Sequence, residues 1–138
     1  MSWLVWAGLS ALFAGMTAIL AKIGVKDVDS NLATAIRTTV ILVFAWSVAL
    51  LRPVQTLHSV SSRTWLFLVL SGLATGASWL CYFRALQLGE ASKVAPIDKL
   101  SVVVAIALAA IFLHETLTWH HWVGGALIVA GAIVIAWA

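Results

Sequence analysis

Residues 94–113 read VAPIDKLSVVVAIALAAIFL, a stretch of twenty residues whose only charges are those of Asp98 and Lys99. A helix of about 20 mainly apolar residues is long enough to cross the hydrocarbon core of a bilayer, which is about 30 Å thick. The uncharged run after Lys99, Leu100 to Leu113, includes Ser101 and is only about 21 Å long as a helix. The stretch therefore predicts a membrane span whose first turns, with their two charges, lie at membrane depth.

The rest of the chain is almost as apolar as this stretch. Hydrophobic residues make up 63% of the 138 residues and charged residues 9%, and the mean hydropathy is +1.08. A soluble domain needs far more charge to cover its surface, so the composition indicates a chain solvated by lipid. We therefore expect a multi-pass protein of the cell (inner or plasma) membrane, with residues 1–138 in a single transmembrane domain.

Five apolar segments are separated by short polar stretches, which predicts an all-α membrane protein with five transmembrane helices. The predicted spans are residues 3–21, 32–51, 65–88, 94–113 and 119–137. Tryptophan side chains prefer the membrane–water interfaces, and most tryptophans fall near the ends of these segments. They are Trp3, Trp6, Trp65, Trp119, Trp122 and Trp137. Asp29 and Ser30 are candidate caps of the second helix, which Arg52 and Pro53 close.

Several classes of function have no support in the sequence. The formal charge is +3, and the basic residues are spread over several loops, so nucleic-acid binding is not expected. No nucleophile–base constellation and no phosphate-binding loop is present, so we expect neither an enzyme nor a cofactor. His114, Glu115, His120 and His121 include no helical i, i+4 histidine pair, so metal binding is not expected either. The lone Cys81 cannot form an intrachain disulfide.

The distribution of basic residues gives a weak prediction of orientation. With five spans, the two termini lie on opposite sides of the membrane. The amino-terminal side receives Arg52 and Arg63, and the other side receives Lys22, Lys26 and Lys93, with Arg37, Arg84 and Lys99 inside helices near it. The positive-inside rule favours an amino terminus outside and a carboxyl terminus inside. The difference is small, which leaves insertion in both orientations open.

Three motifs resemble the carboxyl-terminal part of an EamA-type repeat, which belongs to the drug/metabolite transporter superfamily. They are A-L-x-L-G-x-A-S-x-V-A-P at residues 85–96, L-x-E-x-L-T at 113–118 and G-G-A-L-I-x-A-G at 124–131. An arginine in the second helix, Arg37 within TAIRTTVIL, is also similar to the family. The resemblance covers essentially the whole chain, and it implies a transporter without selecting a substrate.

Most members of this family have two such repeats in ten helices, the second inverted relative to the first, whereas this chain has one. Transporters built on inverted repeats place the substrate at the repeat interface near the bilayer midplane. The resemblance therefore implies an antiparallel homodimer with dual topology that resembles a ten-helix transporter. Small multidrug exporters of the same superfamily use a membrane glutamate in the first helix. No acidic residue lies between Trp3 and Ala21, so that mechanism is not transferred to this chain.

Polar side chains that share a helix face are the first candidates for a substrate cavity. In the third helix, Ser71, Thr75, Ser78 and Tyr82 recur at spacings of four, three and four, with Trp79 beside them. The alternative is helix packing, with each hydroxyl bonded to the carbonyl four residues earlier. In the first helix, Ser10 and Thr17 lie on one face with Trp6, and the alternative there is contact with lipid or a neighbouring helix.

Charged residues inside the spans are the second group of candidates. Arg37 lies roughly 8 Å inside the second helix, where it faces a cavity or extends to the headgroups. Arg84, near the end of its helix, suits a lipid phosphate. Asp98 and Lys99 border a substrate vestibule or belong to a helix start, with Pro96 in its first turn. Adjacent helical residues point about 100° apart, so we expect no pairing of Asp98 with Lys99.

Small residues indicate where helices pack closely. Gly72 and Gly76 form a stripe with Trp79 and Phe83 in the third helix, and Gly124 and Gly131 form a second seam. We expect these four glycines to serve helix packing or dimer contact.

Together, these features predict a membrane transporter of small organic solutes, such as a metabolite, an amino acid or an amphipathic drug. It would work by alternating access at a cavity in the dimer interface. The expected partners are the small-molecule substrate, membrane lipid and a second copy of the chain. Two alternatives stay open, which are a non-transporting assembly or regulatory subunit and a translocase of a lipid-linked substrate.

Overall fold

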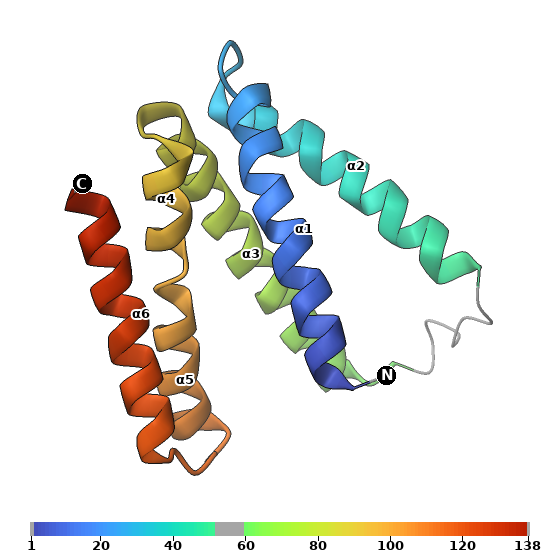
Figure 1. Ribbon diagram of the computed structural model, residues 1–138. Coiled ribbons are helices and arrows are strands. Elements are labelled where there is room, and N and C mark those ends of the chain that lie inside the picture. The colour runs from blue at the N-terminus through green and yellow to red at the C-terminus, as the bar shows by residue number, and fades with distance from the viewer. Residues whose placement is uncertain (1, 52–59, 138) are drawn as a thin grey trace. The chain divides into compact units, whose positions relative to one another are not determined.

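The computed structural model describes residues 2–51 and 60–137, and these residues form helices with no strand (Figure 1). Five stretches of helix are long and apolar enough to cross a membrane, so the predicted all-α architecture with five spans is confirmed. Arg52 and Pro53, expected to close the second span, lie outside the described residues, as do both terminal residues. The helices are α1 Trp3–Gly24, α2 Ser30–Leu50, α3 Ser62–Leu88, α4 Ala91–Asp98, α5 Ser101–Phe112 and α6 Trp119–Trp137.

The backbone contacts divide the chain into two compact units. One consists of Met1–Lys22 with Leu88–Ala138, and the other is Ile23–Gln87. After their places in the sequence, the first is the outer unit and the second is the central unit. That the whole chain forms one domain stays a prediction.

In the outer unit, α6 packs along both α4 and α5 (Figure 1). The face that α6 turns inward has small side chains, since Gly125 and Ala132 are its buried residues. A Cβ atom at Gly125 would lie 3.9 Å from Cγ2 of Val103, so α5 passes close to the α6 backbone there. Lys22, at the end of α1, donates a hydrogen bond of 2.7 Å to the carbonyl of Gly89, just before α4.

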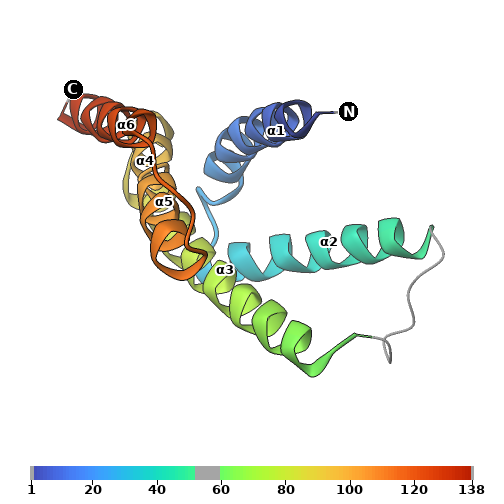
Figure 2. The same cartoon turned by 90° about the horizontal axis from the view of Figure 1, so that it is seen from below.

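In the central unit, the end of α3 holds the turn that precedes α2. Gln87 Nε2 donates to the carbonyl of Val28 at 2.7 Å and to that of Val25 at 3.4 Å. The Oε1 atom of the same side chain accepts a hydrogen bond of 3.0 Å from Arg84 Nη1. Figure 2 shows α2 and α3 close together at this end. One side-chain amide thus satisfies backbone carbonyls that no helix can pair.

The predicted fourth span is two helices, α4 and α5, rather than one. Between them, Lys99 N donates to the carbonyl of Pro96 at 3.1 Å and Leu100 N to that of Ile97 at 3.0 Å. These are three-residue turns that interrupt the α-helical pattern. The expectation that Pro96 lies in the first turn is wrong, because α4 begins at Ala91 after Glu90. Proline has no N–H to donate, and the helix ends two residues beyond it.

The start of α2 agrees with the predicted cap. Asp29 is the N-cap residue, and its Oδ1 accepts hydrogen bonds from the backbone N–H groups of Asn31 at 2.9 Å and Leu32 at 3.1 Å. Ser30 and Thr34 in the first turn are buried, and Thr34 Oγ1 donates to the carbonyl of Ser30 at 2.8 Å.

We predict that Asp29→Ala lowers the free energy of unfolding by about 1 kcal/mol, because two N–H groups at the helix start lose their acceptor. Asp29→Ser should retain most of this energy. Asp27→Ala is the matched control, since it removes an equal charge from the same turn. Thermal unfolding in a neutral detergent measures the difference, and equal effects of Asp29→Ala and Asp27→Ala would contradict this role of the cap.

Candidate functional site

The central unit positions a cation against two aromatic rings. Arg37 lies seven residues beyond the start of α2, about 10 Å along the helix. Its Cζ is 4.4 Å from the ring centroid of Trp79 and 5.4 Å from that of Phe83. Trp79 and Phe83 are four residues apart in α3, so both rings project from one face toward α2. We call Arg37, Trp79 and Phe83 the arginine–aromatic cluster.

The charge of Arg37 is met by ring faces rather than by a carboxylate. The ion pair found in the described ranges 2–51 and 60–137 joins Asp98 and Lys99 and does not involve Arg37. Phe83 is only 3% exposed and Arg37 is half-buried, so the cation–π contacts are partly shielded from solvent. Such contacts stabilise by about 0.5–1 kcal/mol when exposed and by about 2 kcal/mol or more when desolvated.

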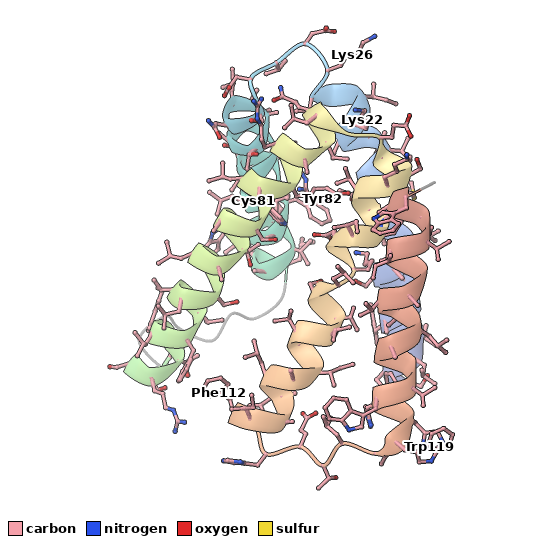
Figure 3. The ribbon with its side chains drawn as sticks, turned by 90° about the vertical axis from the view of Figure 1, so that its left-hand side faces the viewer. Lys22, Lys26, Cys81, Tyr82, Phe112 and Trp119 are labelled. Atoms are coloured by element: carbon pink, nitrogen blue, oxygen red, sulfur yellow. The ribbon has the colours of Figure 1, made fainter. Side chains whose placement is uncertain are left out.

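The sequence predicted two members of this cluster and placed the third differently. Arg37 and Trp79 were both candidates for the substrate cavity, whereas Phe83 was assigned only to a packing stripe. The spacing of four residues from Trp79 to Phe83 was the feature that could have identified it. Tyr82, also a candidate, packs edge-to-face against Phe83 with ring centroids 6.4 Å apart. In Figure 3, Cys81 and Tyr82 leave α3 on different sides.

The hydroxyl groups predicted along α3 lie on an exposed surface. Ser71, Thr75 and Ser78 are all exposed. Thr75 Oγ1 donates to the carbonyl of Ser71 at 2.9 Å, so this hydroxyl makes the bond that the packing alternative expects. Their role in substrate binding stays a prediction.

The remaining candidates belong to the outer unit. Ser10 in α1 is exposed and Thr17 is half-buried. Asp98 is the last residue of α4, and Lys99 begins the turn that leads to α5. The structure places these four in a different unit from the arginine–aromatic cluster, and their part in a substrate site also stays a prediction.

Asp98 and Lys99 form an ion pair, and the expectation that they do not pair is wrong. Lys99 Nζ lies 3.6 Å from Asp98 Oδ2, with both side chains partly exposed. The expectation assumed a regular helix, whereas the chain turns between α4 and α5 at this point. The pair lies roughly 10 Å along the fourth span from its start at Ala91, so an interruption and two opposite charges coincide at membrane depth.

The histidine-rich turn between α5 and α6 has a structural role. His121 Nδ1 lies 3.1 Å from the backbone N of Thr118, which donates to it, and 2.9 Å from Thr118 Oγ1. His114 has a positive φ of 54° just beyond α5. Phe112 and Trp119 mark the two ends of this turn in Figure 3. No group of three potential metal ligands occurs among the residues that the structure describes.

The four predicted packing glycines have open space beside them. A Cβ atom added at Gly72, Gly76, Gly124 or Gly131 would meet nothing within 4 Å in the described part of the chain. The close approach within one copy uses Gly125 instead, next to the predicted seam. Use of the four glycines for dimer contact stays a prediction.

The five apolar spans make the chain a multi-pass membrane protein, as predicted. It belongs to the EamA-like transporter family, whose pattern matches residues 1–137. The predicted family is therefore confirmed.

The chain is similar to three proteins from different organisms. An "uncharacterized transporter in cobO 3'region" of Sinorhizobium sp is 54% identical over 136 residues, which cover 98% of this chain and 96% of the relative. A "probable 4-amino-4-deoxy-L-arabinose-phosphoundecaprenol flippase subunit ArnE" of Aeromonas salmonicida is 28% identical over 69 residues, covering 50% of this chain and 60% of that protein. The uncharacterized protein MJ1333.1 of Methanocaldococcus jannaschii is 31% identical over 70 residues, covering 51% of each. No solved structure matches the chain.

We predict that Trp79→Leu lowers the free energy of unfolding by about 1–2 kcal/mol, because Arg37 loses the nearer of its two rings inside a span. Trp79→Phe should lose less, since a smaller ring face remains. Trp65→Leu is the control, as it removes an exposed indole from the other end of α3. Unfolding in a neutral detergent measures all three variants. Equal losses for Trp79→Leu and Trp65→Leu would show that Arg37 gains nothing from the ring.

Proposed function

We propose that the protein transports small organic solutes by alternating access, as an antiparallel homodimer with its substrate cavity at the dimer interface. The observation that best supports this is the interruption of the fourth span at Lys99 and Leu100. Irregular backbone at membrane depth is tolerated where it lines a cavity or is buried in protein. Transporters use such discontinuous helices near the midplane to build substrate sites.

A second copy would supply what one copy leaves open. The hydroxyl groups of α3 are exposed, and Gly72, Gly76, Gly124 and Gly131 have space beside them. Small residues favour close helix contact in lipid, and polar side chains favour a water-filled cavity over hydrocarbon. In this proposal the chain acts as one domain, and its inverted partner replaces the second repeat of a ten-helix transporter. The small charge difference between the loops is compatible with dual topology.

The candidate cavity consists of the polar and aromatic residues that the sequence predicts for it. Its polar members are Ser10, Thr17, Arg37, Ser71, Thr75, Ser78, Asp98 and Lys99, with Trp79 and Tyr82 as aromatic walls. A cavity with few charges and aromatic walls suits a partly apolar solute, such as a metabolite, an amino acid or an amphipathic drug.

A second candidate is translocation of a lipid-linked substrate. It is favoured by the similarity to a protein named as a probable flippase subunit for a phosphoundecaprenol-linked sugar. A lipid-linked substrate would need a groove open to the bilayer near Arg37 and Arg84. A non-transporting subunit would need neither a groove nor a cavity.

We predict that Ser78→Cys, in a Cys81→Ala background, reacts with a membrane-impermeant thiol reagent in liposomes, because a carrier exposes this face to water. Leu73→Cys, an exposed apolar position of the same helix, should stay unreactive in lipid. The same liposomes serve for uptake screening with metabolites, amino acids and amphipathic drugs. An unreactive Ser78→Cys together with an absence of uptake would favour the non-transporting alternative.

Cross-linking tests the antiparallel dimer. Five spans place Ser2 and Ala136 on opposite sides of the membrane, so an antiparallel dimer brings Ser2 of one copy to the side of the partner's Ala136. We therefore predict that Ser2→Cys and Ala136→Cys chains, both with Cys81→Ala and differently tagged, cross-link to each other. Recovery of Ser2→Cys homodimers and Ala136→Cys homodimers without the mixed product would indicate a parallel dimer and rule out this assembly.

A further inference from the structure

Among the described arginines, Arg37 occupies the position furthest from the end of its span. It is about 10 Å beyond the start of α2, whereas Arg84 is four residues from the end of α3 and Arg63 is the second residue of that helix. Arginine in a span is costly, and its charge usually meets a partner or faces a cavity. Arg84 is exposed and donates to Gln87, while Arg63 is exposed at the opposite helix end. Arg37 alone therefore needs a reason for its depth.

The aromatic rings stabilise the charge of Arg37 but leave its hydrogen bonds unmade. A guanidinium has five N–H donors in a fixed fork, which matches the two oxygens of a carboxylate or a phosphate. In the described residues, no side chain or carbonyl accepts a hydrogen bond from Arg37, and no carboxylate lies within ion-pair distance of it. The nearby hydroxyls of Thr34 and Thr38 donate to backbone carbonyls of their own helix.

We propose that the arginine–aromatic cluster binds an oxyanion, a carboxylate or a phosphate, borne by a partly apolar ligand. This inference rests on the transporter function proposed above and narrows its substrate to anions. The guanidinium would donate two N–H groups to two oxygens of the ligand. Trp79 and Phe83 hold the guanidinium in place and give the apolar part of the ligand a surface to contact. Tyr82, which packs against Phe83, extends the aromatic surface along α3.

Small aromatic probes test the charge preference without knowledge of the substrate. The purified full-length chain, in a neutral maltoside detergent, is unfolded by heat at rising concentrations of phenyl phosphate, benzoate or benzylamine. A ligand that binds only the folded state raises the unfolding midpoint, and the rise grows with the logarithm of the ratio of ligand concentration to Kd. We expect both anions to raise the midpoint of the unmodified protein, and benzylamine to leave it unchanged.

The variants assign the effect to Arg37. Arg37→Gln should weaken the affinity for phenyl phosphate by about 10-fold or more, since charge-assisted hydrogen bonds are lost. Arg63→Gln is the matched control, because it removes the same charge from the other end of α3 and should leave the affinity unchanged. If Arg37→Gln fails to fold, Arg37→Lys serves instead. It keeps the charge but loses the planar fork, so a weaker affinity for both anions is again expected.

A lipid arm distinguishes the two sources of such an anion. The affinity for phenyl phosphate is measured in maltoside micelles with and without added phosphatidylcholine, which brings a lipid phosphate without net charge. If a lipid phosphate is the ligand, phosphatidylcholine should weaken phenyl phosphate binding in the unmodified protein. If a soluble organic anion is the ligand, the affinity should be unchanged. Both results support the oxyanion site.

Three results would overturn the proposal. The first is an equal affinity for phenyl phosphate in the Arg37→Gln and Arg63→Gln variants. The second is a rise of the unfolding midpoint with benzylamine equal to the rise with the anions. The third is a double variant, Arg37→Gln/Asp98→Asn, that is more stable to unfolding than either single variant. The last would show that Arg37 pairs with Asp98 rather than with a ligand.

Failure of this site and failure of the transport proposal give different results. Uptake of a neutral or cationic solute that Arg37→Gln leaves intact would contradict the anion site alone, whereas anion binding without uptake would contradict transport alone.

Discussion

The structure depends on the absence of water in the hydrocarbon core, where each backbone carbonyl and each charge needs a partner from the protein. Helices satisfy the carbonyls within each span, whereas the turn between α1 and α2, at the ends of two spans, has carbonyls that no helix pairs. Gln87 meets that need by donating to Val25 and Val28, and Arg84 in turn orients Gln87. The same need explains the two aromatic rings around Arg37. In the central unit, these contacts bring the end of α3 to the start of α2.

The number of spans and the cap of α2 could be predicted because both depend on local sequence. Hydropathy averaged over about 20 residues identifies a span irrespective of its tertiary contacts. The N-cap at Asp29 likewise depends on residues within three positions. The interruption at Lys99 and Leu100 could not be predicted in this way, since an average over the fourth segment stays strongly apolar. Pro96 was recognised, but its position was assigned to a helix start rather than to the approach of a helix end.

Long-range partners explain the other differences. Gln87 received no role from the sequence, because its acceptors lie 59 and 62 residues earlier in the chain. Phe83 was grouped with packing residues, since only the fold brings Arg37 within 5.4 Å of its ring. The predicted seam consists of Gly124 and Gly131, whereas Gly125 is the residue that faces Val103, because the face of α6 turned toward α5 depends on the rotation of the helix. For the candidate site, the residues that take part could thus be predicted from the sequence better than the residues that they contact.

The small-residue face of α6 also has a mechanical consequence. The turn at Lys99 divides the fourth span into two rods, α4 and α5, which are joined by three-residue turns. Both rods lie against α6, whose buried residues are Gly125 and Ala132 rather than bulky side chains. Small side chains let both rods come close to the α6 backbone. α6 therefore supports both halves of the fourth span, whose own α-helical hydrogen bonding is interrupted between them.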